Sequence, residues 1–196
     1  MLRRGFKIVS LLIGLFLITG SYMYLFSANW GDSFDIILTP SGDRGVMIDA
    51  ESINIGDLQA GTTYVHSSSI LVTSTGTIAG IEYTIRATTS TPASTLSYDG
   101  IADQNDEIVL QVLFNSTAPN DSAWEENGPT ANLVTFSAKA VGDTTTPNTN
   151  FEGNEDMDNL GLNEGRHLWF RIKTPPAWTT GTQQTITLII TAEPAD

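Results

Sequence analysis

Apolar and polar residues alternate with a period of two over much of the chain after residue 30. The clearest case is the run IEYTIRATT from Ile81 to Thr89, in which one parity is apolar and the other polar or charged. A second run, TTYVHSSSILVTS from Thr62 to Ser74, precedes it, and the turn Ser74–Thr77 lies between them. Alternation of this kind predicts half-buried strands on both sides of the turn.

Similar patterns predict strands along the rest of the chain: 34–39, 46–55, 96–98, 107–115, 133–139, 166–173 and 183–191. The segment Glu107 to Asn115 (EIVLQVLFN) is the most apolar of them and is expected at the centre of a sheet. The last two strands are expected to pair with each other. One short helical turn is expected between Ala118 and Gly128, starting at Pro119.

About nine short strands separated by turn signals predict an all-β fold. The expected architecture is a single immunoglobulin-like or jelly-roll-type β-sandwich over residues 29–196, preceded by an apolar segment over residues 1–28. Parity within each strand predicts the core. The expected core residues are Ile70, Val72, Ile81, Tyr83, Ile85, Val109, Val112, Phe114, Leu168, Phe170, Ile186, Leu188 and Ile190. Val109 and Val112 differ in parity, so both are buried only if the strand has a bulge or two buried faces.

The N-terminal segment has a basic head followed by 21 uncharged residues from Ile8 to Ala28. Three interpretations remain open: a cleaved secretory signal, an uncleaved membrane anchor over residues 8–28, and a prepilin-type signal. The third rests on Arg3-Arg4-Gly5-Phe6, which resembles the start of type IV prepilins, although Ser10 stands where that family has Glu. All three export the body, so we expect an extracellular or cell-surface protein of a prokaryote.

Charge and composition limit the classes of molecule and metal site that this chain can bind through. The formal net charge is -13, and three of the nine basic residues precede the apolar segment, which leaves six basic against 22 acidic residues in the body. A body this acidic disfavours nucleic acid, because phosphate binding needs Lys and Arg. The chain has no Cys, which excludes disulfides and thiolate metal sites.

No motif points to catalysis. The only residues able to act as a histidine base are His66 and His167, and each lies within a predicted strand, where a structural or surface role is expected. The sequence has no phosphate-binding glycine loop, HExxH motif or nucleophile elbow. We therefore expect no enzyme and no cofactor apart from a metal ion.

Calcium is the metal that the sequence suggests. Oxygen ligands crowd the long polar loop, and the candidate ligands are Glu152, Asn154, Asp156 and Asp158, with Glu155 and Asn159 beside them. Carboxylate and amide oxygens suit calcium outside the cell. A solvated acidic loop without metal is the alternative.

Three tryptophans and two asparagines are further candidate functional residues. Trp124, Trp169 and Trp178 are expected to pack in the core, with a sugar-stacking platform as the alternative. Asn115 and Asn120 begin Asn-x-Ser/Thr triplets and are candidate glycosylation sites.

A family resemblance links these patterns. The order is a short strand, a Leu-x-x-Gly turn, a strand, a small-residue turn with Gly and another strand: Ile53–Ile55, Leu58–Gly61, Ile70–Val72, Ser74–Thr77 and Ile81–Tyr83. This succession, over roughly residues 25 to 90, resembles the TasA/camelysin group of secreted, fibre-forming β-sandwich proteins. Phe26–Asn29 and Phe34–Leu38 also resemble that family's segment after the signal. The resemblance implies extracellular fibres in which an N-terminal strand of one subunit completes the sheet of the next.

The leading functional hypothesis is a structural subunit of an extracellular filament, a homopolymer assembled by strand complementation. Its candidate contact residues are Phe34, Ile36, Ile37 and Leu38, in a segment that needs a sheet to bury its apolar face. If a neighbour supplies that sheet, subunits join head to tail; if the chain's own sheet does, the segment is an ordinary first strand. The alternative function is a membrane-anchored monomeric adhesion module that binds carbohydrate or depends on calcium.

Overall fold

The computed structural model describes residues 31–41, 45–76, 80–89, 94–126, 128–142, 150–155, 160–179 and 181–194. The apolar segment over residues 1–28, with its three interpretations, lies outside this part of the chain. Among the residues described, no helix is long and apolar enough to cross a membrane.

The described residues are all-β, with one short 3-10 helix, η1 (Asp121–Glu125). The strands are β1 (Gly31–Ser41), β2 (Val46–Ile48), β3 (Ser52–Gln59), β4 (Thr63–Val65), β5 (Ile70–Ser74), β6 (Ile81–Thr89), β7 (Thr95–Leu96), β8 (Glu107–Phe114), β9 (Leu133–Val134), β10 (Lys139–Ala140), β11 (Gly165–Lys173) and β12 (Gln184–Pro194). The helical turn starts two residues after Pro119, because the Asn120 side chain caps it by accepting a hydrogen bond from the backbone N–H of Ala123.

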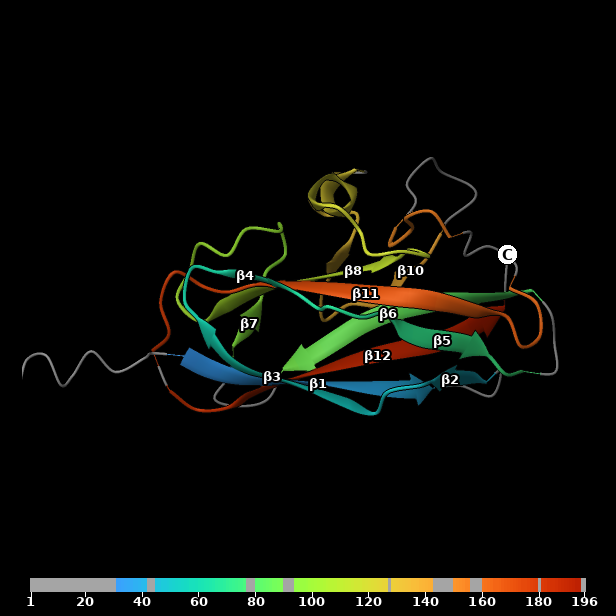
Figure 1. The fold of residues 1–196 in the computed structure, drawn as a ribbon, viewed down its shortest axis with the longest axis horizontal. Coiled ribbons are helices and arrows are strands. Elements are labelled where there is room, and N and C mark those ends of the chain that lie inside the picture. The colour runs from blue at the N-terminus through green and yellow to red at the C-terminus, as the bar shows by residue number, and fades with distance from the viewer. Residues whose placement is uncertain are drawn as a thin grey trace, which may run out of the picture. The chain divides into compact units, whose positions relative to one another are not determined.

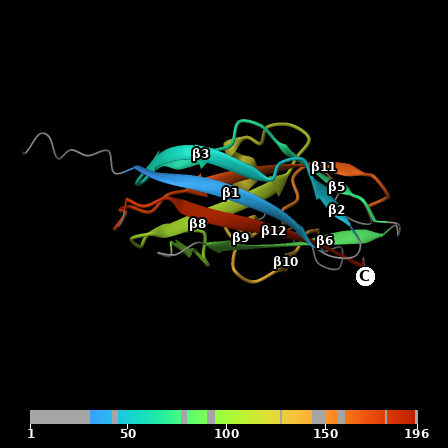
Figure 2. The same ribbon diagram turned by 90° about the horizontal axis from the view of Figure 1, so that it is seen from below.

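The strands form two sheets packed face to face, which confirms the predicted β-sandwich (Figure 1). The first sheet has the order β10-β6-β12-β1-β3, and Figure 2 shows β3, β1 and β12 side by side. The second has the order β2-β5-β11-β8-β7, with β4 paired to β11 and β9 paired to β8. Most pairs are antiparallel, but β1 runs parallel to β12 and β7 runs parallel to β8.

All thirteen predicted core residues are buried. In β6 the burial alternates along the strand, as the sequence pattern predicts. In β8 the residues from Ile108 to Phe114 are all buried, so Val109 and Val112 lie on two opposite buried faces. No bulge is needed to explain them, because β8 pairs with β11 in an unbroken register.

Several predicted strands are divided in the structure. The run from Thr62 to Ser74 becomes β4 and β5, which both pair with β11. Val65 faces Arg171 and Ile70 faces Leu168. Five residue steps from β4 to β5 therefore lie opposite only three steps along β11. The polar residues between β4 and β5 take up this excess as a bulge. The predicted strand 46–55 likewise becomes β2 and β3, in different sheets.

The last two predicted strands do not pair with each other, which corrects that expectation. β11 lies in the second sheet and β12 in the first, where it is held between β1 and β6. The predicted strand 133–139 is also divided between sheets, because β9 pairs with β8 and β10 pairs with β6. In a sandwich, consecutive strands often belong to opposite layers, and strand patterns alone do not show where the chain crosses over.

Candidate assembly interface

The predicted contact segment lies in β1, in the interior of the first sheet. β1 pairs with β12 from Phe34 to Ser41 and with β3 from Gly31 to Ile37. Both of its edges are therefore paired within the same chain. The structure thus shows the segment as a first strand of its own domain, one of the two arrangements that the sequence left open.

The side chains of β1 follow the predicted alternation where they are described. Ile36 and Leu38 are buried in the main core, and Ile37 is 37% exposed on the outer face. Phe34 lies in the paired part of the strand, but its side chain is outside the described part. Ile36 and Leu38 therefore supply apolar surface to the core between the sheets.

Further hydrogen bonds hold β1 beside its neighbours. The Gln183 side chain donates to Asp35 at 2.6 Å, and the backbone N–H of Leu38 donates to the Glu51 carbonyl at 3.2 Å. β3 has no strand partner other than β1 among the described residues. Removing β1 would therefore open one edge of β12, detach β3 and uncover the core where Ile36 and Leu38 pack.

The exposed edges of the sandwich are poorly suited to adding a strand. β3 is the only long edge strand among the described elements, and it is interrupted where Gly56 faces Phe34 and Asn54 faces Asp35. Gly56 has a φ of +78°, and its N–H donates to the side chain of Asn54 at 2.8 Å. A bulge of this kind is a common protection of edge strands. The described edge strands β2, β7 and β10 are only two or three residues long.

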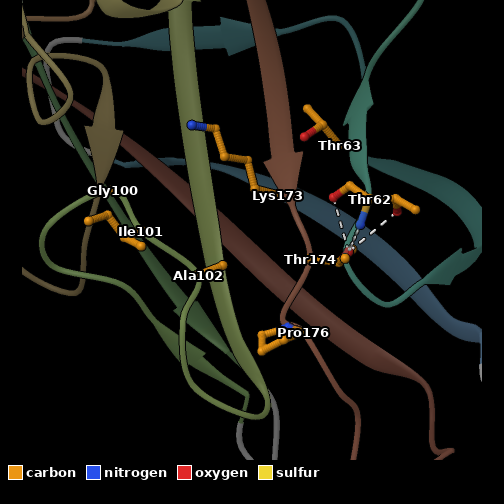
Figure 3. A pocket seen from close by; sticks show the side chains of 9 residues that line it. Thr62, Thr63, Gly100, Ile101, Ala102, Lys173, Thr174 and Pro176 are labelled. Carbon is orange, nitrogen blue, oxygen red and sulfur yellow. Dashed lines mark hydrogen bonds between the residues drawn. The ribbon is translucent and has the colours of Figure 1, made fainter.

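A pocket of about 350 Å³ lies at the end of the sandwich where β1 begins (Figure 3). Its lining includes Thr62, Thr63, Ile101, Lys173 and Thr174. Two of the threonine hydroxyls are already used, since Thr62 Oγ1 and Thr174 Oγ1 each donate to the Gln59 carbonyl at 2.7 Å. Lys173 Nζ lies 3.2 Å from Glu125 Oε1. The lining has no carboxylate, histidine or cysteine, so it offers no acid–base pair or nucleophile of those types.

Both histidines are held by neighbouring side chains. The His66 ring stacks on Phe170 with centroids 4.7 Å apart, and its Nδ1 lies 3.0 Å from the Tyr64 hydroxyl. Burial lowers the pKa of His66. His167 Nδ1 lies 2.9 Å from Glu155 Oε1, and its backbone N–H donates to Glu155 Oε2 at 2.6 Å. These contacts connect loops to strands.

The calcium prediction falls only partly on described residues. Asp156 and Asp158 lie outside them, as does Asn159. The Asn154 side-chain oxygen accepts hydrogen bonds from the backbone and hydroxyl of Ser116, at 2.7 and 3.1 Å. The backbone of Glu152 forms an isolated β-bridge with that of Phe114, and the Glu155 carboxylate binds His167. The described part of the chain contains no group of three or more His, Asp or Glu placed to hold a metal ion, so calcium binding stays a prediction.

The three candidate tryptophans pack inside the protein, as predicted. Trp124, Trp169 and Trp178 are all buried, so they do not form an exposed platform for sugar stacking. Asn115 is also buried, and its amide nitrogen donates to the Thr117 carbonyl at 2.7 Å. A glycan on Asn115 would have to displace that bond. Asn120 is exposed at the cap of η1 and stays a candidate acceptor.

One polar cluster was missed by the sequence reasoning. On the outer face of the second sheet, Arg171 Nε and Nη2 donate to Gln111 Oε1 at 2.9 and 2.6 Å. The Arg171 guanidinium also lies 5.2 Å from the Trp124 ring centroid and 3.2 Å from Glu125. Gln111 and Arg171 are directly opposed in the ladder. The available signal was one polar residue within each of two apolar runs: Gln111 in IVLQVLF and Arg171 in LWFRI.

Comparison with known proteins does not show which family the chain belongs to. No protein-family model matches the chain. No curated protein sequence gives a significant match either.

Proposed function

We propose that this protein is a non-enzymatic structural subunit of an extracellular or cell-surface filament of a prokaryote, and that its subunits are joined by exchange of β1. In the exchanged state, β1 of one copy would occupy the position between β12 and β3 of another copy. Export rests on the basic head and the 21 uncharged residues of Ile8–Ala28. The resemblance of residues 25 to 90 to the TasA/camelysin group supports the filament.

The observation that carries the proposal is the place of β1 in the first sheet. β1 is the first described strand, yet it lies in the sheet interior, paired over most of its length on both sides. Main-chain hydrogen bonds would give an exchanged strand its affinity, and the core around Ile36 and Leu38 would fix its register. Exchange of an identical element is a low-cost route to association, because the same contacts form again between copies.

The sandwich edges favour exchange over simple strand addition. The bulge in β3 interrupts the only long edge described, and an interrupted ladder offers few consecutive hydrogen bonds to an added strand. The β1 position, in contrast, provides a ladder of eight residue pairs with β12. The position that β1 fills therefore offers a longer ladder to a bound strand than the described exposed edges do.

The test begins with electron microscopy of full-length protein from the native cell surface, where regular filaments are expected. Deleting Asn29–Leu38 should abolish these filaments. The shortened chain also loses part of its core. A synthetic peptide of residues 31–41 is therefore added to the deletion variant to refill the β1 position. We expect the peptide to bind and to restore protection of β12 amides from hydrogen exchange.

A matched control peptide carries Ile36→Asp and Leu38→Asp, which places charge on the two buried positions. It should not bind, because burying unpaired carboxylates is costly. Filaments formed by the deletion variant would show that β1 does not join the subunits. Absence of filaments from the native surface would overturn the filament function itself.

A further inference from the structure

The end of β1 and the start of the remaining sandwich lie at the same end of the molecule. Ser41 pairs with Thr191 near the end of β12. After three intervening residues, the Gly45 carbonyl accepts a hydrogen bond from the backbone N–H of Thr75 at 2.9 Å, and Val46 pairs with Ser74. Figure 2 shows β1 arriving at the end where β2 and β5 lie. We call this end, defined by Ser41, Gly45 and Thr75, the hinge end.

The connection sets how far apart two exchanging copies can be. A chain of four residue steps, from Ser41 to Gly45, spans at most about 14 Å. In an exchanged state, Ser41 stays beside Thr191 of the accepting copy, while Gly45 stays beside Thr75 of the donating copy. The hinge ends of the two copies must therefore lie within about 14 Å of each other.

We propose that exchange of β1 is reciprocal and closes between two copies of this chain, which face each other through their hinge ends. The proposal rests on the exchange named under the proposed function. A donor that has lost its own β1 has an open β1 position whose hinge end lies beside the accepting copy. The strand that the accepting copy has released starts from that same place, so it can fill the position without a third molecule.

Mass action favours this closure over an open series. A short linker gives a tethered segment an effective concentration in the millimolar range. At micromolar protein, the partner's β1 therefore outcompetes the β1 of a third copy by a factor of about 10³. In a closed two-fold contact the β1 position of each copy is filled by the other copy, so strand exchange alone gives pairs. Exchange of β1 would then join the two subunits within each pair, and contacts other than β1 would join the pairs into the filament.

Engineered cysteines can record which copy fills each β1 position. Ile37 and Ser52 are opposed on β1 and β3, and both are exposed. Opposed residues in an antiparallel pair have Cα atoms about 4.5–5.5 Å apart, which suits a disulfide. The natural chain has no Cys, so the full-length variant with Ile37→Cys and Ser52→Cys has a single possible pair of thiols. The assembled variant is oxidised, denatured and separated by mass without reductant.

Each outcome has a distinct meaning. Reciprocal exchange converts most of the protein to a covalent dimer, which collapses to monomer on reduction. A ladder of trimers and longer species would keep the exchange of the proposed function but overturn reciprocal closure. Monomers alone would overturn exchange and the closure with it, and filaments seen by microscopy in that same sample would keep the filament function through other contacts.

The control is the full-length variant with Thr88→Cys and Thr187→Cys. These residues are opposed on β6 and β12, both of which stay in the same body during exchange of β1. Its disulfide should remain within one chain, so it should run as a monomer under the same conditions. Covalent dimers in this control would show that oxidation links colliding molecules, and dimers of the β1–β3 variant would then not support closure.

Discussion

The two sheets of the sandwich differ in what covers their outer faces. Along β12 and β6 the burial alternates, and the outward residues, such as Thr88 and Thr187, are partly exposed. Along β8, seven consecutive residues are buried. The difference lies outside the strands, because η1 packs against the outer face of the second sheet, at the top of Figure 1.

The covered face has its own small core. Leu113, Trp124 and Trp169 form a separate buried cluster, and Trp169 Nε1 donates to the Asn115 carbonyl at 2.7 Å. Gln111 and Arg171 lie on the same face, where Gln111 Oε1 accepts two hydrogen bonds from the Arg171 guanidinium. Similar strand propensity therefore gives a strand with one buried face or two, depending on what packs over its outer face.

The largest expected effect is in the core that both sheets share. Phe114 is fully buried there and packs near Tyr83, with ring centroids 6.4 Å apart. Phe114→Ala should lower the free energy of unfolding by about 3–5 kcal/mol, because it removes a large apolar side chain and leaves a cavity. Thr187→Ala on the uncovered face should change it by less than about 1 kcal/mol. Urea unfolding of both variants measures this contrast, and similar losses in the two would contradict the one-sided burial of the first sheet.

The next effect concerns the polar pair on the covered face. Arg171→Met should lower the free energy of unfolding by about 1–3 kcal/mol, because Gln111 Oε1 loses its donor in a buried position. The double variant with Gln111→Leu should recover part of this loss, since removing both partners of a buried hydrogen bond can be nearly neutral. A double-mutant cycle by urea unfolding measures the coupling. A stability gain in the single Arg171→Met variant would mean that the covered face prefers to be wholly apolar.

The smallest expected effect is a pH dependence at the rim of the covered face. The hydrogen bond and charge of Lys173, followed by those of Arg171, lower the pKa of Glu125 below its ordinary value of 4.5. A carboxylate with a lowered folded-state pKa stabilises the fold above its unfolded pKa, and this contribution is lost as pH falls through the folded pKa.

Glu125→Gln should therefore cost less than about 1 kcal/mol at pH 7, because this ion pair is largely exposed. The cost should disappear as pH falls below 4.5. Urea unfolding of both proteins between pH 3 and pH 7 measures it. A difference that stays constant over this range would show that the charge of Glu125 does not contribute.

The sequence predicted the inner face of the sandwich well, because period-two burial is a local property. Every predicted core residue is buried, and β6 and β12 follow their patterns closely. Which strands pair with each other was harder to predict from the sequence. β11 and β12 are consecutive long strands, yet they lie in different sheets. Pairing depends on where the chain crosses between layers, and the loop between β11 and β12 does not specify the crossing by its residue types.

For the candidate interface, the sequence by itself determined that residues 34–38 form a strand with an apolar face that a sheet must bury. Only the tertiary structure decided that this strand lies inside its own sheet, parallel to β12, with its connection at the hinge end. The sequence likewise determined that β8 is apolar on both parities, but only the packing of η1 explains why both faces are buried. The physical reason is the same in both cases. Local alternation sets which side chains leave water, whereas contacts between segments far apart in the chain set what they are buried against.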